Sequence, residues 1–370
     1  MKTSLMAEIT KILSKAPIVQ NLARKKFIAQ FTIGVIKSRN VQFCQVAQHL
    51  NDQAKPSSNE VRIQDFFREV DLDYACVAML LLSLLPRDKK LRLCIDRTEW
   101  DFGCYQANIL MVTVSYQQMS VPLYWEMLNN NSGNSSCQQR NDLLGLCIDL
   151  IGVERIGLVI GDREFVGHRW LKYLKDKKVA FLMRLPKHHK IHRLDGRRQT
   201  VDKLGLLEDK PLMFQDCLVD GVVGNVWVML QQDGDYLFLF GTIAVEFMGQ
   251  LYRKRWSIEA CFQNMKGRGF DLEKTHLQDD EKLKKLVALV SIAYGLCASL
   301  GIYYHCKVQA IKRKNHGYKA KSFVRKGIDL IQEWFRANNH LPDYALKRFL
   351  CFIRYLQISL PIYQPLKIAG

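Results

Sequence analysis

Hydrophobic and polar residues follow two different periods along the 370-residue chain, and each period predicts a kind of element. Up to residue 85 the apolar positions recur at helical spacing, in 27–38 and 73–86, with a polar linker at 51–60. Short apolar runs follow, each with the length of a β-strand. These runs are 91–96, 107–116, 120–128, 155–160, 179–185, 222–230 and 236–243.

Helical patterns are interspersed with these strands. Residues 138–152 and 166–178 each predict a helix, and a long helix is predicted at about 246–268. The stretch from Pro186 to about Asp235 is expected to be irregular apart from the strand at 222–230. This order of strands and helices predicts an α/β domain with helical regions on both sides.

One apolar segment has nearly the length of a membrane span. It runs from Leu286 to Tyr304 and carries no charge over 19 positions. It also contains two serines, two glycines and three tyrosines, and it stands alone in an otherwise polar chain. We therefore expect a buried core helix and no membrane partner.

Polar side chains border the apolar face of the helix predicted at 246–268. At about 100° per residue, one arc of roughly 60° holds Tyr252, Arg255, Glu259 and Lys266. The neighbouring arc holds the residues expected to be buried, which are Phe247, Leu251, Ile258, Phe262 and Met265. A solvated stripe usually lies opposite the buried face, so this position indicates either a functional site or a partly solvated helix.

The net charge of +18 is concentrated at the two ends of the chain. Residues 1–90 hold 14 Lys and Arg against 8 Asp and Glu, residues 91–300 hold 27 against 25, and residues 301–370 hold 13 against 3. A nearly neutral centre between basic ends is typical of a protein that binds a polyanion such as nucleic acid. A basic surface that serves solubility is the alternative.

Cysteine and histidine usage points away from disulfides and metal fingers. The eleven cysteines contain no CxxC pair and no signal peptide is visible, which predicts reduced thiols in a cytoplasmic protein. His188, His189 and His192 lie close together, but without neighbouring cysteines or acidic partners. A basic surface loop is therefore favoured there over a metal site.

Three acidic residues stand out by position. Asp96 is expected to end the first strand, Asp162 follows the strand at 155–160, and Glu259 lies on the long helix. Acids at the carboxyl ends of strands in α/β domains commonly meet at a site. Carboxylates suit Mg²⁺, and two such ions can activate the attacking oxygen and stabilise the leaving oxygen of a phosphodiester. Taken singly, each acid could instead cap a turn or a helix, or pair with a neighbouring arginine.

These residues carry a resemblance to a known family. The spacing of Tyr252, Arg255, Glu259 and Lys266 resembles a family signature. This signature, Tyr-x2-Arg-x3-Glu-x6-Lys, is that of a large group of bacterial insertion-sequence transposases. The segment CIDRTEW around Asp96 resembles the first catalytic aspartate of that group. The segment VIGDREFVGHRWLKYL around Asp162 resembles the second, and the similarity extends over about 90–300.

The resemblance implies a DDE transposase with an RNase H-like core, which is a mixed five-stranded sheet with helices. A β-rich insertion at about 186–243 would interrupt this core. The implied domains are a helical N-terminal DNA-binding region at 1–88, the catalytic domain at 89–304 and a basic helical C-terminal region at 305–370.

Site roles are also implied. Asp96, Asp162 and Glu259 would be catalytic and would hold two Mg²⁺ ions, for which Mn²⁺ can substitute. The residues that would contact phosphates of the transposon end are Tyr252, Arg255 and Lys266.

Further DNA contacts are implied outside the signature. Arg184, at the end of the strand 179–185, would be one of them. In relatives an aromatic residue stabilises a flipped base during a hairpin step, and by spacing Tyr236 matches it best, with Trp227 second. A plain core aromatic is the alternative for this position.

The implied activity is cut-and-paste transposition at the terminal inverted repeats of insertion-sequence DNA, by the hairpin route. Its partners would be double-stranded DNA of the transposon ends and the target, and a second copy of the chain in the synaptic complex. Its place would be the bacterial cytoplasm, at the nucleoid. The alternatives are an RNase H-like nuclease that does not join strands and a catalytically silent, transposase-derived DNA-binding protein.

Overall fold

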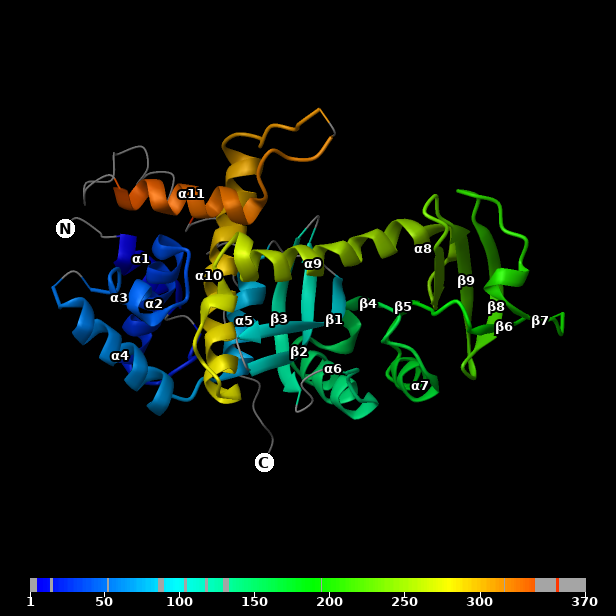
Figure 1. Ribbon diagram of the computed structural model, residues 1–370, viewed down its shortest axis with the longest axis horizontal. Coiled ribbons are helices and arrows are strands. Elements are labelled where there is room, and N and C mark those ends of the chain that lie inside the picture. The colour runs from blue at the N-terminus through cyan, green and yellow to red at the C-terminus, as the bar shows by residue number, and fades with distance from the viewer. Residues whose placement is uncertain are drawn as a thin grey trace. The chain divides into compact units, whose positions relative to one another are not determined.

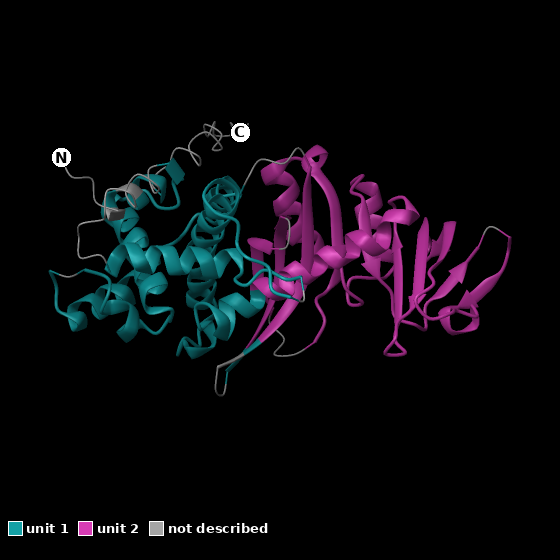
Figure 2. Ribbon diagram, turned by 90° about the horizontal axis from the view of Figure 1, so that it is seen from above, with its two compact units in different colours: residues 1–87, 100–106, 262–370 teal, residues 88–99, 107–261 magenta. Residues whose placement is uncertain are grey.

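The computed structural model describes residues 5–13, 16–51, 53–85, 90–102, 105–116, 119–128, 133–193, 195–315, 317–336 and 351–352. Most of the predicted C-terminal region beyond 336, and Pro86, therefore lie outside the described residues. The chain divides into two compact units, coloured separately in Figure 2. Unit 1 comprises residues 1–87, 100–106 and 262–370, and unit 2 comprises residues 88–99 and 107–261.

Unit 1 is built from helices. They are α1 (Leu5–Leu13), α2 (Leu22–Ser38), α3 (Phe43–Ala47), α4 (Pro56–Glu69), α5 (Tyr74–Ser83), α10 (Asp280–Lys307) and α11 (Phe323–Arg336). The linker predicted at 51–60 is wrong in its second half, because α4 begins inside it with Pro56 in its first turn. Proline suits that position because its missing N–H has no partner there in any helix.

The uncharged segment of the sequence forms the centre of α10. Among the described residues α10 alone is long and apolar enough to cross a membrane, but 94% of its most apolar window is buried within the protein. This confirms the prediction of a buried core helix. Its close neighbour is α11: a Cβ added to Gly301 or to Gly327 would lie 1.9 Å from a carbonyl oxygen of the other helix. Glycine is therefore needed at both positions for the two backbones to touch.

Unit 2 is organised around one ten-stranded sheet (Figure 1). The strand order is β3-β2-β1-β4-β5-β10-β9-β8-β6-β7. The strands are β1 (Leu91–Phe102), β2 (Tyr105–Tyr116), β3 (Met119–Leu128), β4 (Ile156–Gly161), β5 (Phe181–Arg184), β6 (Lys190–His192), β7 (Arg198–Thr200), β8 (Leu212–Val219), β9 (Val222–Leu230) and β10 (Tyr236–Gly241). The mixed α/β class predicted from the order of elements is confirmed.

Strand directions change within the sheet. β1, β4 and β5 pair in parallel, whereas β2 with β3 and the series β5, β10, β9, β8, β6 and β7 pair antiparallel. The prediction that β1 ends at Asp96 is wrong, because the strand continues to Phe102. Its parallel pairing with β4 does end there, at Ile95 opposite Gly161. A strand that loses one neighbour and keeps the other does not end, and β2 still borders β1.

The segment between β5 and β9 is more regular than its sequence indicates. Three strands, β6, β7 and β8, lie in the stretch expected to be irregular. β6 and β7 have three residues each, and most of β8 is exposed. None of the three buries a continuous apolar face, so the hydrophobic period that identifies strands is missing.

Four helices pack with this sheet. α6 (Cys137–Ile151) begins with a capping box between Ser136 and Gln139 and lies beside α7 (His168–Asp176) (Figure 1). The predicted long helix is wrong as one regular element. It consists of α8 (Val245–Tyr252), a 3₁₀ turn at Arg253–Arg255, α9 (Trp256–Gln263) and a π-helical turn at Asn264–Arg268. These turns change the angle per residue, so α8 does not continue the buried face of α9 as a uniform helix would. Phe247 of α8, which was expected to be buried, is 52% exposed.

Candidate active site

The first two acids lie at the point where parallel pairing in the sheet ends. Ile95 of β1 pairs with Gly161, the last residue of β4, so Asp96 and Asp162 are the next residue along each strand. Each carboxylate accepts a hydrogen bond through Oδ1 from the N–H of the following residue, Arg97 or Arg163, at 2.8 Å. The sheet thus aims both carboxylates in a defined direction at its carboxyl edge.

The third acid reaches the same place from the helix, through an arginine. The Arg255 guanidinium donates to Asp96 Oδ2 at 3.0 Å and to Glu259 Oε1 at 2.5 Å, and lies 3.6 Å from Asp162 Oδ2. Ser257, on the first turn of α9, lies 3.1 Å from Ser115 of β2 and 2.6 Å from Ser120 of β3, oxygen to oxygen. These buried contacts hold α9 across the sheet, and the three predicted acids are therefore brought together around one guanidinium.

Tyr252 belongs to this cluster. Its hydroxyl donates to Asp162 Oδ1 at 3.1 Å, and its ring centroid lies 5.6 Å from the Arg255 guanidinium carbon. Burial raises the pKa of Tyr252, so the phenol keeps its proton and acts as a donor. Tyr252 and Arg255 of the polar stripe are thus buried and not solvated, whereas Glu259 is 33% exposed.

The cluster carries two more negative than positive charges when all three acids are ionised. Burial raises the pKa of Asp96 to about 6, against the opposing effect of Arg255 and with a further increase from Asp162 and Glu259. Burial alone would lower the pKa of Arg255, but Tyr252 and the three carboxylates outweigh it and raise that pKa. Arg255 is therefore a permanent cation, and the surplus of negative charge favours further cations.

The elevated pKa of Asp96 predicts how stability depends on pH in metal-free protein. Between pH 3.8 and about 6 the folded state binds more protons than the unfolded state, so the free energy of unfolding falls as pH rises through this window. The total fall from this one group is about 3 kcal/mol. We expect the Asp96→Asn variant to show a flatter profile between pH 4 and 6 in urea denaturation with EDTA. Parallel profiles for the variant and wild type would contradict the assigned burial effect.

Lys266 is described with unit 1 and not with this cluster. Its backbone has ψ of −141° within the π-helical turn, so the regular helical step behind the predicted arc does not apply to it. Its ammonium lies 3.5 Å from Glu273 Oε1 and 5.9 Å from the Trp100 ring centroid. A phosphate contact by Lys266 stays a prediction.

The other predicted DNA contacts lie on β5, β9 and β10. Arg184 donates to Asp235 Oδ2 at 2.8 Å, an oxygen that also accepts from Arg163. Tyr236 begins β10 and is partly exposed. Trp227 is 7% exposed, and a Cβ added to Gly249 of α8 would lie 2.9 Å from its ring. The tryptophan thus packs under α8 as a core aromatic does, whereas the tyrosine is the more accessible of the two rings.

A second hydrogen-bond network, not predicted from the sequence, joins the segments that follow the two aspartates. Arg97 follows Asp96, and Glu164 lies two residues after Asp162. Arg97 Nε donates to Glu164 Oε2 at 3.0 Å, and its Nη1 donates to Asn108 Oδ1 at 3.0 Å and to Glu99. The available signal was the opposite charge placed directly beside each acid, in the segments CIDRTEW and GDRE.

Glu164 also holds the segment that leads into α6. Its Oε1 accepts from the N–H of Ser135 at 2.8 Å and from the Ser135 hydroxyl at 2.6 Å. Arg140 donates to the Ser135 hydroxyl at 2.8 Å and to its carbonyl at 2.6 Å. Through these bonds Glu164 joins β1, the turn after β4 and the start of α6. Its side chain is only 13% exposed, so little water competes for these bonds.

Removing Glu164 should therefore be costly. In Glu164→Ala, Arg97 loses an ion-pair partner and Ser135 loses its acceptor, and we expect the free energy of unfolding to fall by about 3 kcal/mol. The matched control is Asp176→Ala, which breaks the exposed pair with Lys172 and should cost less than about 1 kcal/mol. Chemical denaturation of both variants measures the difference, and equal costs would contradict a structural role for the network.

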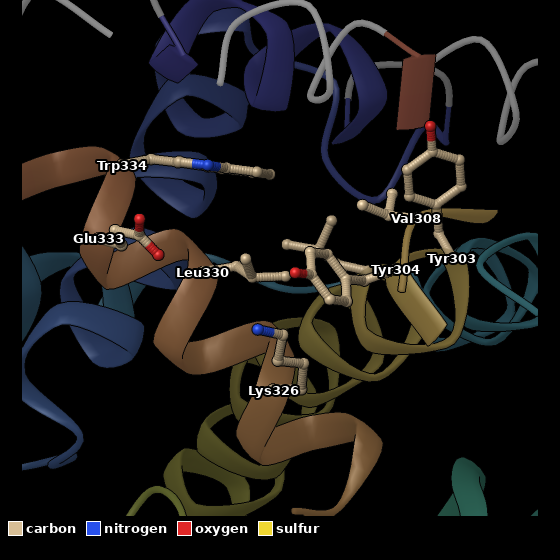
Figure 3. A pocket seen from close by; sticks show the side chains of 8 residues that line it. Tyr303, Tyr304, Val308, Lys326, Leu330, Glu333 and Trp334 are labelled. Atoms are coloured by element: carbon tan, nitrogen blue, oxygen red, sulfur yellow. The ribbon is translucent and has the colours of Figure 1, made fainter. Parts of the chain in front are cut away.

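A cavity in unit 1 offers no comparable chemistry (Figure 3). It has a volume of about 180 Å³ and lies between α10 and α11. Lys326 points over the ring of Tyr304, with 4.0 Å between the ammonium and the ring centroid, so its charge is already engaged there. Leu330 and Trp334 contribute apolar surface, and Glu333 is the one acid among the lining residues that the structure describes.

Comparisons with known proteins identify a family that this chain matches and one similar solved structure. Residues 91–296, more than half of the chain and including all three acids, match the family described as the transposase DDE domain. No curated protein matches the chain. One similar solved structure is described as "Cryo-EM structure of piggyBac transposase synaptic complex with hairpin DNA (SNHP)", with 11% identity, a TM-score of 0.47, and coverage of 100% of this chain and 84% of that chain. By the match to its family, this chain belongs to the transposase DDE domain proteins.

Proposed function

We propose that the chain cleaves insertion-sequence DNA at its terminal inverted repeats and joins the freed end to target DNA, in a cut-and-paste reaction. The observation that carries this proposal is the convergence of Asp96, Asp162 and Glu259 on Arg255, inside the span that matches the transposase DDE domain. Phosphoryl transfer needs charge stabilisation more than covalent chemistry, and this cluster supplies charged groups at one point.

We further propose that the strands β3-β2-β1-β4-β5 form an RNase H-like core. The support is their order, with β1, β4 and β5 parallel and β2 and β3 antiparallel to each other. Strands β6 to β10 then form the β-rich insertion at about 186–243, because they follow β5 in sequence and extend the sheet on one side.

Two Mg²⁺ ions are the proposed cofactor, with Mn²⁺ able to substitute. No group of three His, Cys, Asp or Glu side chains in the described part of the chain has the spacing of a single metal cage. Mg²⁺ does not need one, since one or two carboxylates with waters and substrate phosphates usually hold it. Three partly exposed carboxylates, at 17%, 31% and 33% for Asp96, Asp162 and Glu259, fit that mode of binding. When bound, the ions activate the attacking oxygen and stabilise the leaving one.

The chain's own groups position the DNA. Arg255 presents a planar, permanently charged fork of donors, the geometry that suits a phosphate. Tyr252 donates one O–H beside it, and a scissile phosphate next to the carboxylates would lie within reach of both. We assign Lys266 and Arg184 to neighbouring phosphates. The 3′ hydroxyl freed by the first cleavage then attacks the phosphodiester of the opposite strand. A new P–O bond forms as the 3′ oxygen of the flanking DNA leaves, so one set of groups serves both steps.

The hairpin route is part of the proposal, with Tyr236 as the residue that stacks on a flipped base. It is the more exposed of the two candidate rings, whereas Trp227 is packed under α8. Double-stranded DNA as partner is supported by the net charge of +18. A homodimer in the synaptic complex and a place at the bacterial nucleoid complete the proposal.

The direct test is an incubation of the protein with duplex DNA from the flanks of its own gene, with and without Mg²⁺. We expect cleavage at a terminal repeat and joining of the 3′ end, both only with Mg²⁺. Cleavage without joining would identify a nuclease. Binding without cleavage would identify a silent DNA-binding protein, and either outcome would reject the proposed transposition.

A further inference from the structure

A second charged cavity lies in unit 2, on the strands that extend the sheet. Its volume is about 460 Å³. The chemically active residues of its lining are His188, His189, His192, Lys190, Arg198 and Asp220, which we call the histidine cavity. None of its described hydrogen bonds or ion pairs involves Asp96, Asp162 or Glu259.

Strand register places three of these side chains on one face of a hairpin, which are those of Lys190, His192 and Arg198. His192 of β6 pairs directly with Arg198 of β7, so their side chains point to the same side. Lys190 lies two residues before His192 on β6 and shares that side, while Ile191 between them is buried. The hairpin thus presents two positive groups, Lys190 and Arg198, on the same face as His192.

Lys190 and Arg198 have no carboxylate within ion-pair distance among the described residues, and the Asp220 carboxylate of the same cavity pairs with His189. Residues 187–203 contain six Lys and Arg against two Asp. One of the two, Asp195, pairs with Arg193 at 3.1 Å and with Arg197 at 3.7 Å. Within the described chain, neither Lys190 nor Arg198 makes an ion pair. An unneutralised pair of cations beside a cavity attracts an anion.

The surroundings of His189 independently indicate an anionic ligand in this cavity. Its Nε2 lies 3.2 Å from Asp220 Oδ2, whereas its Nδ1 is buried and has no hydrogen-bond partner in the structure. Leaving a buried polar atom unpaired is costly, so a ligand atom at Nδ1 would be stabilising. When the ring is doubly protonated, one N–H donates to the Asp220 carboxylate and the other can donate to a ligand oxyanion.

The turn that carries Asp220, the partner of His189, has a defined backbone conformation. Asp220 and Gly221 form the turn between β8 and β9, both with positive φ, 49° and 75°. The carbonyl of Asp220 lies 2.7 Å from His168 Nδ1 at the start of α7. The His189 hydrogen bond lowers the pKa of Asp220, so this carboxylate stays ionised and keeps orienting the imidazole.

The same residues do not suit a metal. Two of the lining side chains, Lys190 and Arg198, are permanent cations at neutral pH and would repel one. No metal-ligand group is present here among the described residues. We propose that the histidine cavity binds a backbone phosphate of DNA, through Lys190, Arg198 and His189, in addition to the contacts at the three acids. This inference rests on the proposed function, because it takes DNA as the partner.

The test compares two double variants that remove equal charge. Lys190→Gln/Arg198→Gln changes the cavity, and Lys203→Gln/Lys210→Gln changes two exposed lysines of the same segment outside it. Binding of the full chain to duplex DNA from its own flanks is measured by fluorescence anisotropy in Ca²⁺ at several salt concentrations. Losing a phosphate contact should weaken binding by about tenfold. It should also reduce the slope of log K against log salt by about 1.

The conservative pair Lys190→Arg/Arg198→Lys should keep most of the affinity. Duplex of unrelated sequence should lose affinity equally, because phosphate contacts carry no sequence information. Equal affinity and slope for the two glutamine doubles would overturn the cavity as a phosphate site. If the wild-type protein cleaves the same DNA in Mg²⁺ while the two glutamine double variants bind DNA with equal affinity, only the phosphate site in the histidine cavity is rejected. If wild type neither binds nor cleaves, the proposed function fails as well.

Discussion

Each of the three substitutions Asp96→Asn, Asp162→Asn and Glu259→Gln is expected to lower Mg²⁺-dependent DNA cleavage by a factor on the order of 10³. Each removes one ligand charge while keeping the shape of the side chain. Metal ions contribute several kcal/mol to charge stabilisation in such reactions, and about 1.4 kcal/mol corresponds to tenfold in rate. Single-turnover cleavage of an end-labelled duplex measures the effect.

DNA binding separates loss of chemistry from loss of fold in these variants. Most affinity for DNA comes from the many basic groups of the chain, of which Arg255 is one that contacts these three side chains. We therefore expect each variant to bind the duplex within about threefold of wild type in the absence of divalent ions. A variant that cuts at a near wild-type rate would show that its residue holds no metal.

The second large effect is expected at Arg255. In metal-free protein, Arg255→Ala leaves three carboxylates facing one another without a cation, because Arg255 bonds or pairs with all of them. Removing one partner from a buried charge cluster costs about 3–5 kcal/mol. We expect the free energy of unfolding of Arg255→Ala to fall by this amount in EDTA.

Mg²⁺ should reverse part of this loss. A divalent ion restores positive charge between the carboxylates, so thermal unfolding of Arg255→Ala should shift upward with Mg²⁺ by more than that of wild type. Arg255→Lys is the control, since it keeps the charge but not the planar fork, and should lie between the two. An identical Mg²⁺ response in all three proteins would contradict the view that guanidinium and metal neutralise the same carboxylates.

Much of the fold follows from the sequence because its core strands are continuous apolar runs. The predicted strand at 222–230 coincides with β9, and the predicted helix at 166–178 contains α7. The same rule explains the errors. β6 and β8 bury few side chains, so they leave no hydrophobic period, and β1 continues past Asp96 because β2, not β4, determines its length.

In the candidate active site, too, local sequence patterns predict some features and long-range contacts determine others. Asp96 and Asp162 are predictable because each directly follows a short apolar run, and Glu259 because it borders the apolar residues of a helical pattern. The position of Arg255 between them could not, since three long-range contacts create it. A uniform helix would place Lys266 on the arc of Glu259, whereas Lys266 lies within the π-helical turn at Asn264–Arg268. Local departures from regular geometry depend on tertiary packing, which the helical period does not carry.

The most direct test of the central claim is cleavage of the polypeptide itself by bound iron. Fe²⁺ takes the place of Mg²⁺ at oxygen ligands, and with ascorbate and peroxide it generates radicals that cut the nearest backbone. The account predicts cuts near Asp96, Asp162 and Glu259 together, suppressed by excess Mg²⁺ and lost in Asp162→Asn. Cuts confined to the segment from His188 to His192, or a pattern unchanged in Asp162→Asn, would contradict a metal site at the three acids.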